Sequence, residues 1–366
     1  MKIASVVGAR PNFIKLIQIH KVISKTFDHT IINTGQHYDF ELSKIFFKEF
    51  NLPKPDFDLE VGSGTAGFQF SQMVEKLEKI FLSSKFDLVI VYGDTNSTFA
   101  GAFTASKCGI DVMHVEAGLR SFDRRMPEES NRILTDHLSK YLIAPTKTAV
   151  NNLKKECVFG NIVYAGDIAV EIVREAVKLS AKSKILDNLG LEPKSYVLFT
   201  MHRAENTSSE DPLASVIRAF EILSEIPIIF PIHPRTEKIL KERKLYERLQ
   251  KCHNVKLIKP VGYVDFIKLM QNAKKILTDS GGIQKEAYLL SIPCITIRDN
   301  TEWVETVEGG WNILTGVHTN KIVKSIRDWM PSRTIKPIFG KGQTSRIIKE
   351  LIASMKKDNK SKIKVS

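Results

Sequence analysis

Short apolar runs rich in β-branched residues alternate with longer segments of helical periodicity along most of the chain. The run LVIVY at residues 88–92 is apolar throughout and leads into Gly93-Asp94-Thr95. A strand without polar positions is typical of a parallel sheet that helices cover on both faces. In segments such as residues 12–24, apolar side chains recur every three or four positions, as in an amphipathic helix. The alternation predicts an α/β fold of doubly wound parallel sheets.

The same plan occurs twice, which predicts two Rossmann-like domains that meet between Gly166 and Asp167. Expected strands are residues 2–7, 29–34, 86–92, 112–115, 141–145 and 162–164 in the first half, and 196–200, 228–232, 255–258, 275–278, 294–297 and 313–314 in the second. Expected helices are residues 12–24, 68–82, 97–106, 147–155, 168–179, 212–224, 265–271, 283–290, 319–330 and 343–355. Residues 51–66, which contain prolines and glycines, are expected to form a loop.

Residues 110–137 carry the densest run of charge. A short apolar strand ends at Val115 and is followed by acidic and basic side chains, namely Glu116, Arg120, Asp123, Arg124, Arg125, Glu128, Glu129 and Arg132. Charges at the carboxyl end of a buried strand are usual where an α/β sheet faces a ligand. A carboxylate there has a pKa that its surroundings can adjust for proton transfer. The alternative is a salt-bridged entry into a helix. Asp94 is a second strand-end carboxylate, for which the alternative is a helix N-cap.

Several turns have features that suit phosphate. Arg10 lies at the start of the first helix with Lys15 about one turn on, although the turn lacks a GxGxxG fingerprint. Asp279-Ser280-Gly281-Gly282 is a glycine-rich turn between a strand and a helix, and Glu286 follows within that helix. His202 and His233 end two other strands, and each has an arginine close behind it. A tight turn and structural histidines are the alternatives for these features.

Composition narrows the choice of partners. The chain has 366 residues and a net charge of +13, which would suit nucleic acid, a membrane surface or an anionic small molecule. It has no nucleic-acid-binding motif and no apolar window of membrane-spanning length, so phosphorylated metabolites fit better. Four scattered cysteines without a CxxC pair indicate reduced thiols and no zinc site. We expect a cytoplasmic protein that binds neither nucleic acid nor membrane.

The chain resembles the non-hydrolysing UDP-N-acetylglucosamine 2-epimerases from Met1 to about Ile352. The matching motifs are GARP at 8–11, GQH at 35–37, YGDT at 92–95, HVEAGLRS at 114–121, PEESNR at 127–132, MHRAEN at 201–206, PIHP at 231–234, TDSGGIQKEA at 278–287 and RDNTE at 298–302. The resemblance implies a GT-B type fold with a central cleft, in which the last helix (343–366) packs back on the first domain (1–166) and residues 167–342 bind UDP. It also implies a homodimer that interconverts UDP-GlcNAc and UDP-ManNAc for surface polysaccharides, with no cofactor and no metal.

By position, the resemblance assigns catalysis to Asp94, Glu116, Glu128 and His202. It assigns substrate binding to Arg10, Lys15, Arg120, Arg132, His233, Ser280, Gly281, Gly282 and Glu286. Gln36 and His37 match part of a regulatory nucleotide-sugar site, although Asp39 departs from that pattern. Asn12 replaces a glutamate that many members carry, a change expected to affect only the helix cap.

Three other functions stay open at this stage. A GT-B glycosyltransferase would share the fold and the nucleotide site but would need only one base and an acceptor groove. A hydrolysing 2-epimerase would release free ManNAc and UDP. A non-enzymatic binder of nucleotide sugars or nucleic acid would bind without turnover, and binding to nucleic acid would weaken steeply with salt.

Overall fold

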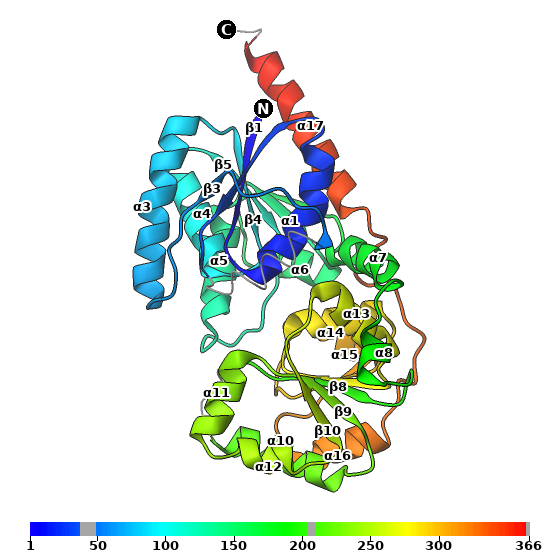
Figure 1. Ribbon diagram of the computed structural model, residues 1–366. Helices are drawn as coiled ribbons and strands as arrows, with labels where there is room; N and C mark the ends of the chain where they lie inside the picture. The colour runs from blue at the N-terminus through cyan, green and yellow to red at the C-terminus, as the bar shows by residue number, and fades with distance from the viewer. Residues whose placement is uncertain (37–48, 204–205, 207–209, 364–366) are drawn as a thin grey trace. The chain divides into compact units, whose positions relative to one another are not determined.

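Parallel strands form both sheets of the structure, a computed structural model that describes residues 1–36, 49–203, 206 and 210–363. Within these residues, the side chains of Arg10 and of residues 356–363 are not described. The chain divides into two units (Figure 1): Met1–Ile172 together with the segment from Pro337 onward, and Val173–Lys336. Each unit has its own sheet and apolar core, as the alternating pattern predicts.

The first sheet has seven parallel strands in the order β3-β2-β1-β4-β5-β6-β7. They are β1 Lys2–Val7, β2 Asp28–Asn33, β3 Phe57–Asp58, β4 Leu88–Tyr92, β5 Asp111–Val115, β6 Tyr141–Ala144 and β7 Asn161–Tyr164. From β1 the chain winds outward through β2 and β3, then returns to β4 on the other side of β1. The switch point of this sheet, where ligands bind in open α/β folds, therefore lies between the ends of β1 and β4.

Helices cover both faces of the first sheet. They are α1 Arg10–Ile23, α3 Ala66–Ser84, α4 Asn96–Lys107, α5 Pro127–Leu138 and α6 Lys147–Lys155. Helix α7 Ala169–Ser180 runs across the boundary between the two units after Ile172, and α17 Thr344–Ile363 packs on α1. Helices α1 and α17 contact each other on one face, while α3, α4 and α5 follow one another on the opposite face (Figure 1). The C-terminal helix therefore packs on the first unit. Its start is fastened there, because Ser345 N–H and Oγ donate to the Glu171 carboxylate.

The second sheet has six parallel strands in the order β10-β9-β8-β11-β12-β13. They are β8 Val197–Thr200, β9 Ile228–Pro231, β10 Val255–Ile258, β11 Lys275–Thr278, β12 Cys294–Thr296 and β13 Asn312–Leu314. The helices are α8 Ile185–Leu189, α10 Glu210–Ile222, α11 Pro234–Glu242, α12 Tyr246–Gln250, α13 Tyr263–Asn272, α14 Gly281–Leu289, α15 Val304–Glu308 and α16 Thr319–Arg327. Its switch point lies between β8 and β11, whose ends carry Met201-His202 and Asp279-Ser280.

The predicted α/β architecture is confirmed, and the differences concern short elements. The segment 51–66 is not wholly a loop, because β3 pairs with β2 at Ile32 and Asn33. Helices α8, α11, α12 and α15 were not predicted; α8, α12 and α15 have five residues each, too few to show a helical period. Helix α11 begins at Pro234, directly after its N-cap His233. From the sequence, His233 and Arg235 were interpreted as strand-end ligand groups, and the helix that starts there was not predicted.

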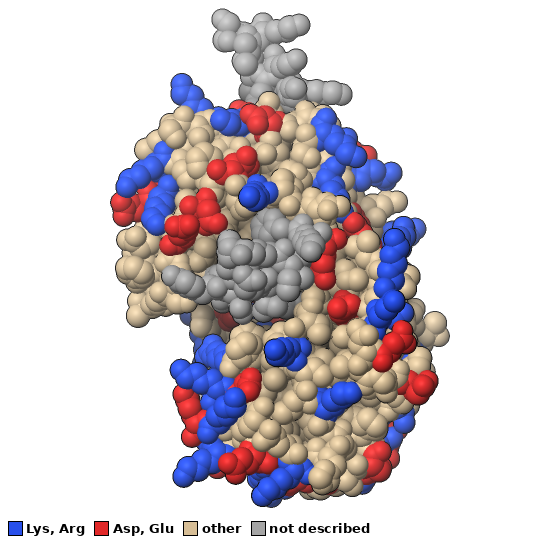
Figure 2. All heavy atoms as spheres, viewed as in Figure 1, with Lys and Arg blue, Asp and Glu red and all other residues tan. Residues whose placement is uncertain are grey.

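Basic and acidic side chains are interspersed over the face of the molecule drawn in Figure 2, so the positive net charge is not gathered into one patch on that face. Within the part of the chain that the structure describes, no helix has the length and apolarity needed to cross a bilayer.

Candidate active site

Asp94 and Glu116 follow neighbouring strands of the first sheet. Strands β4 and β5 are in register with Tyr92 opposite Val115, so both carboxylates lie at the carboxyl edge of the sheet. Asp94 also lies beside the switch point, because β4 pairs with β1 on its other side. Both acids were predicted from the apolar runs that precede them, and the structure places both at the same edge of one sheet.

Glu116 is held in an unusual backbone conformation. Its φ is +77°, in the left-handed region that costs a side-chain-bearing residue free energy. The N–H groups of Glu116 and Ala117 both donate to the carbonyl of Ile143. Lys15 Nζ donates to Glu116 Oε1 at 2.6 Å, and the side chains of this ion pair are 11% and 9% exposed. Lys15 therefore meets a candidate catalytic acid, and the surrounding contacts stabilise the strained turn.

Gly93 makes room for this ion pair, which gives a first prediction. Its φ is +66°, and a Cβ there would lie 2.7 Å from Lys15 Nζ. Gly109 has nearly the same φ, +69°, but a Cβ there would meet no atom within 4 Å, so Gly109→Ala carries the backbone cost alone. We expect Gly109→Ala to lower the thermal midpoint of unfolding by about 2–4 °C and Gly93→Ala by up to about twice as much, since Lys15 Nζ must also shift within its ion pair with Glu116. Equal shifts in a thermal unfolding experiment would contradict this explanation.

Asp94 is not the N-cap of the following helix. Thr95 caps α4 instead, and its Oγ1 accepts from Thr98 N–H at 3.3 Å. The Asp94 carboxylate accepts from Arg132 Nη2 at 2.7 Å, and Asn131 Nδ2 donates to the Asp94 backbone carbonyl at 3.0 Å. The N-cap alternative is therefore wrong. Arg132, expected to contact substrate, is 2% exposed and holds the Asp94 carboxylate from helix α5.

Asn12 fastens the two turns at the switch point. Its Oδ1 accepts from the N–H groups of Gly8 and Ala9, and its Nδ2 donates to the Tyr92 carbonyl at 2.7 Å. Thr95 Oγ1 also donates to Asn12 Oδ1. The residue was expected to affect only the helix cap; it caps α1 and in addition connects the ends of β1 and β4.

A buried network of charges lies beside Glu116. Arg120 is 3% exposed, and its guanidinium bonds Asp136 at 2.8 Å and Glu156 at 2.7 and 2.6 Å. His114 Nε2 donates to the Gly93 carbonyl at 2.7 Å while Nδ1 meets Asp136 at 2.7 Å. Burial opposes ionisation of Arg120, but these carboxylates raise its pKa above the usual range. From the sequence, Arg120 was expected to contact the substrate directly. Its burial and its two carboxylate partners instead favour a role in supporting the turn at residues 116–120.

In the second unit, the buried Asp279 organises the switch point. Its carboxylate accepts from the N–H groups of His202 (3.1 Å) and Arg203 (3.0 Å) and from Asn206 Nδ2 (3.2 Å). Ser280 N–H donates to Thr278 Oγ1 at 3.0 Å. The ends of β8 and β11 are therefore fixed to each other by one carboxylate, whose importance the sequence interpretation missed.

The predicted glycine turn leads directly into helix α14, with Ser280 as N-cap and Gly281 and Gly282 as its first residues. A Cβ on Gly281 would lie 1.9 Å from Glu302 Oε1, so glycine is required there for close approach. Arg298 Nη1 binds the same carboxylate at 2.9 Å, and Arg203 Nη2 lies 3.6 Å from it. A carboxylate with two arginines beside it therefore lies against the first turn of α14, a helix start of the kind at which anions bind.

The remaining predicted residues of this unit lie near these ends. The rings of His202 and His233 have centroids 6.5 Å apart. Arg235 N–H donates to His233 Nδ1, which leaves Nε2 as the protonated nitrogen of a neutral His233 ring. Glu286 accepts from Tyr263 Oη at 2.7 Å.

The structure places the other predicted residues as follows. Glu128 is half-buried as the second residue of α5. Gln36 Oε1 accepts from Ser97 N–H and Oγ at 3.0 and 2.7 Å. Arg10 begins helix α1, but its side chain is outside the described part, and His37 is outside it entirely.

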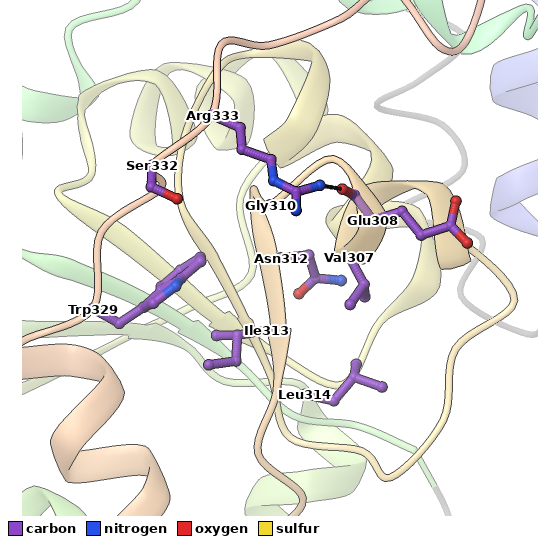
Figure 3. Close-up of a pocket in the computed structure, with 9 residues that line it drawn as sticks. All are labelled: Val307, Glu308, Gly310, Asn312, Ile313, Leu314, Trp329, Ser332 and Arg333. Carbon is purple, nitrogen blue, oxygen red and sulfur yellow. Dashed lines mark hydrogen bonds between the residues drawn. The ribbon is translucent and has the colours of Figure 1, made fainter.

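A surface hollow of about 700 Å³ lies elsewhere in the second unit, lined by β13, the end of α15 and the segment around Trp329 and Arg333 (Figure 3). Arg333 Nη1 donates to the Glu308 carbonyl at 2.6 Å across one side of it. None of the predicted site residues that the structure describes lines this hollow. Over the described residues, no three His, Cys, Asp or Glu side chains gather as a metal-ligand group.

Comparisons with known proteins identify the family of this chain. The family described as UDP-N-acetylglucosamine 2-epimerase matches residues 21–353. A UDP-N-acetylglucosamine 2-epimerase homolog of Methanococcus maripaludis is 53% identical over 97% of this chain and 100% of its own. The crystal structure of Methanocaldococcus jannaschii UDP-GlcNAc 2-epimerase in complex with UDP-GlcNAc and UDP has a TM-score of 0.90 and 45% identity, covering 96% of this chain and 100% of that one.

A further relative differs in the sugar it is named for. The UDP-2,3-diacetamido-2,3-dideoxy-D-glucuronate 2-epimerase of Pseudomonas aeruginosa is 42% identical over 97% of this chain and 100% of its own. The names of all three proteins refer to a 2-epimerase and to a UDP-linked acetamido sugar. The chain belongs to the UDP-N-acetylglucosamine 2-epimerase family, whose members are isomerases of nucleotide sugars.

Proposed function

We propose that this protein interconverts UDP-GlcNAc and UDP-ManNAc by eliminating and re-adding UDP. The hydrogen at C2 of the sugar is weakly acidic because no carbonyl adjoins it. As the bond between C1 and the UDP oxygen breaks, C1 gains positive character and C2–H becomes more acidic. A base takes the C2 proton, 2-acetamidoglucal and UDP form, and UDP then adds back to C1 while an acid delivers a proton to the other face of C2. Two faces require two positioned acid–base groups.

Support comes chiefly from Glu116. A carboxylate that is largely buried, paired with Lys15 and presented on a left-handed backbone is typical of a reacting group. Asp94 follows the neighbouring strand of the same sheet, so a second acid is at hand. We assign the proton transfers to Asp94, Glu116 and Glu128, with His202 assisting the departing diphosphate.

The second unit has features for holding UDP through the intermediate. The start of α14 offers N–H groups of Gly281 and Gly282 for the diphosphate, and Glu286 suits the ribose diol. Ser280, His233 and Arg10 complete the proposed binding set. Lys15, Arg120 and Arg132 act on the site through carboxylates. We also propose a cytoplasmic homodimer that supplies ManNAc units for polysaccharides, as the family resemblance implies.

A related UDP sugar is the second candidate substrate, since the 42% identical relative from Pseudomonas aeruginosa is named for UDP-2,3-diacetamido-2,3-dideoxy-D-glucuronate. The elimination at C1 and C2 would be the same for this compound, because the 2-acetamido group and the UDP leaving group are shared.

One incubation distinguishes these possibilities. The protein is mixed in D2O with UDP-GlcNAc alone, and in parallel with the diacetamido uronate, and proton NMR follows C2–H. Loss of that signal together with formation of UDP-ManNAc is the expected result. Exchange only with the uronate would select the second substrate, release of free ManNAc and UDP would indicate a hydrolysing enzyme, and no exchange without an acceptor would favour a glycosyltransferase.

Gln36 stays the candidate for regulation by a second nucleotide sugar. Its contact with Ser97 lies at the start of α4, and the neighbouring Asn96 Oδ1 accepts from Asn131 Nδ2, which also donates to Asp94. Displacement of Gln36 would therefore be transmitted to a proposed catalytic acid. Hyperbolic dependence of the rate on UDP-GlcNAc concentration would contradict this regulation.

A further inference from the structure

Glu129 is a buried carboxylate to which the function described so far gives no role. It is the third residue of α5, directly after the proposed catalytic Glu128, and is 2% exposed. Burying a carboxylate is costly unless its oxygens are satisfied. The partners that satisfy Glu129 therefore indicate what it does.

The first set of partners belongs to the loop after the HVEAGLR motif. Glu129 Oε2 accepts from Ser121 N–H at 2.9 Å and Ser121 Oγ at 2.8 Å, and Oε1 accepts from Phe122 N–H at 2.9 Å. Phe122 has a φ of +58° and is largely exposed, so packing of its own side chain contributes little to holding that conformation. The Glu129 carboxylate thus fixes two successive N–H groups of a strained turn.

The second partner is Arg132, one helical turn further along α5. Its Nη1 donates to Glu129 Oε2 in a short contact, while its Nη2 donates to Asp94 Oδ2 at 2.7 Å. A guanidinium is planar, so fixing one of its terminal nitrogens fixes the direction of the other. Burial opposes ionisation of Glu129, but the Ser121 and Phe122 hydrogen bonds and the Arg132 charge outweigh it and lower its pKa. The carboxylate is therefore charged and able to hold Arg132 at neutral pH.

We propose that Glu129 is a positioning residue for the epimerase reaction: it aims the Arg132 guanidinium at the Asp94 carboxylate and anchors the turn at residues 121 and 122. This inference rests on the proposed function, because it gives Asp94 a catalytic role. Without Glu129, Arg132 loses its fixed orientation, and the Asp94 carboxylate is no longer held in one position at the end of β4. Glu129 itself does not touch the reacting atoms.

A double-mutant cycle on the full-length protein tests the connection to Arg132. If Glu129 acts through Arg132, removing it costs nothing further once Arg132 is gone. We expect Glu129→Gln to lower kcat roughly 30-fold with KM for UDP-GlcNAc within about 3-fold, Arg132→Met to lower kcat roughly 100-fold, and the double variant to equal Arg132→Met within about 3-fold. A double variant about 3,000-fold slower, the product of the single effects, would overturn the proposal.

Glu171→Gln is the matched control, because Glu171 accepts from the N–H and Oγ of Ser345 much as Glu129 does from Ser121. It should lower the thermal midpoint as Glu129→Gln does and leave kcat within about 2-fold. A comparable loss of kcat in Glu171→Gln would show that the effect is general destabilisation, and the proposal would fail.

Amide hydrogen exchange supplies a readout that does not depend on turnover. In Glu129→Gln, amides 121 and 122 should exchange at least about 10-fold faster than in the wild type, with little change in the strands β4 and β5. Unchanged protection of these two amides would overturn the proposal even if the wild type turned over no UDP-GlcNAc. Failure of the wild type to exchange C2–H would count against the proposed function alone.

Discussion

Glu116→Gln is expected to lower the rate of deuterium incorporation at C2 of UDP-GlcNAc by about three orders of magnitude. Glutamine has nearly the same shape and can still accept from Lys15, but it cannot take up or deliver a proton. The loss should appear in kcat, and KM should change little because Glu116 is not among the groups proposed to bind UDP. UDP affinity measured by calorimetry should therefore match that of the wild type.

The control for this substitution is Glu75→Gln on helix α3. Glu75 pairs with Lys79 at 2.7 Å on an exposed surface, where solvent screens the pair and it contributes little to stability. Exchange at C2 should be unaffected in Glu75→Gln. If Glu116→Gln kept C2 exchange within about 10-fold of the wild type while folding normally, Glu116 would not be a proton-transferring group and the proposed acids would reduce to Asp94 and Glu128.

The parts of the site that the sequence predicts are those with a local signature. Asp94 and Glu116 each follow a buried apolar run, and such a run in an alternating α/β pattern indicates a parallel strand whose end faces ligands. The glycines after Ser280 likewise indicate a turn into a helix. Strand order is not local, yet doubly wound connections restrict it so strongly that the strand-end groups were expected at one edge.

Pairing between charged side chains could not be predicted in the same way. Arg120 and Arg132 stand in motifs typical of ligand binding, and the sequence shows their charges but not their partners. In the structure Glu156 and Asp94 satisfy them, from other elements of the fold. The second role of Asn12 was not predicted because Asn12 connects β1 to β4, which come together only when the sheet forms. Glu129 was overlooked although its partners are close in sequence, because the charge run does not show which of its carboxylates turns back onto residues 121 and 122. Short helices such as α12 were missed because a helix of five residues is too short for apolar positions to recur with helical spacing.

Asp279→Ala should cause the largest loss of stability among the changes considered for the second unit. Asp279 is fully buried, and its removal leaves the N–H groups of His202 and Arg203 and the Asn206 side chain without their acceptor. A stranded buried donor costs about 1–3 kcal/mol, so a loss of about 3–5 kcal/mol in the free energy of unfolding is expected. The turn after β8 would then no longer be fixed to the start of α14.

Denaturant unfolding and calorimetry with UDP check this prediction together. We expect Asp279→Ala to weaken UDP binding roughly 10- to 100-fold, because the proposed cradle at Gly281 depends on a fixed turn. Asp279→Asn keeps one oxygen acceptor and should lose less on both measures. Asp265→Ala removes an acceptor of a single Ser183 hydroxyl bond in the same unit, so it should cost about 1 kcal/mol and leave UDP affinity unchanged. If Asp279→Ala behaved like Asp265→Ala, the two strand ends would be held together by packing and not by this carboxylate.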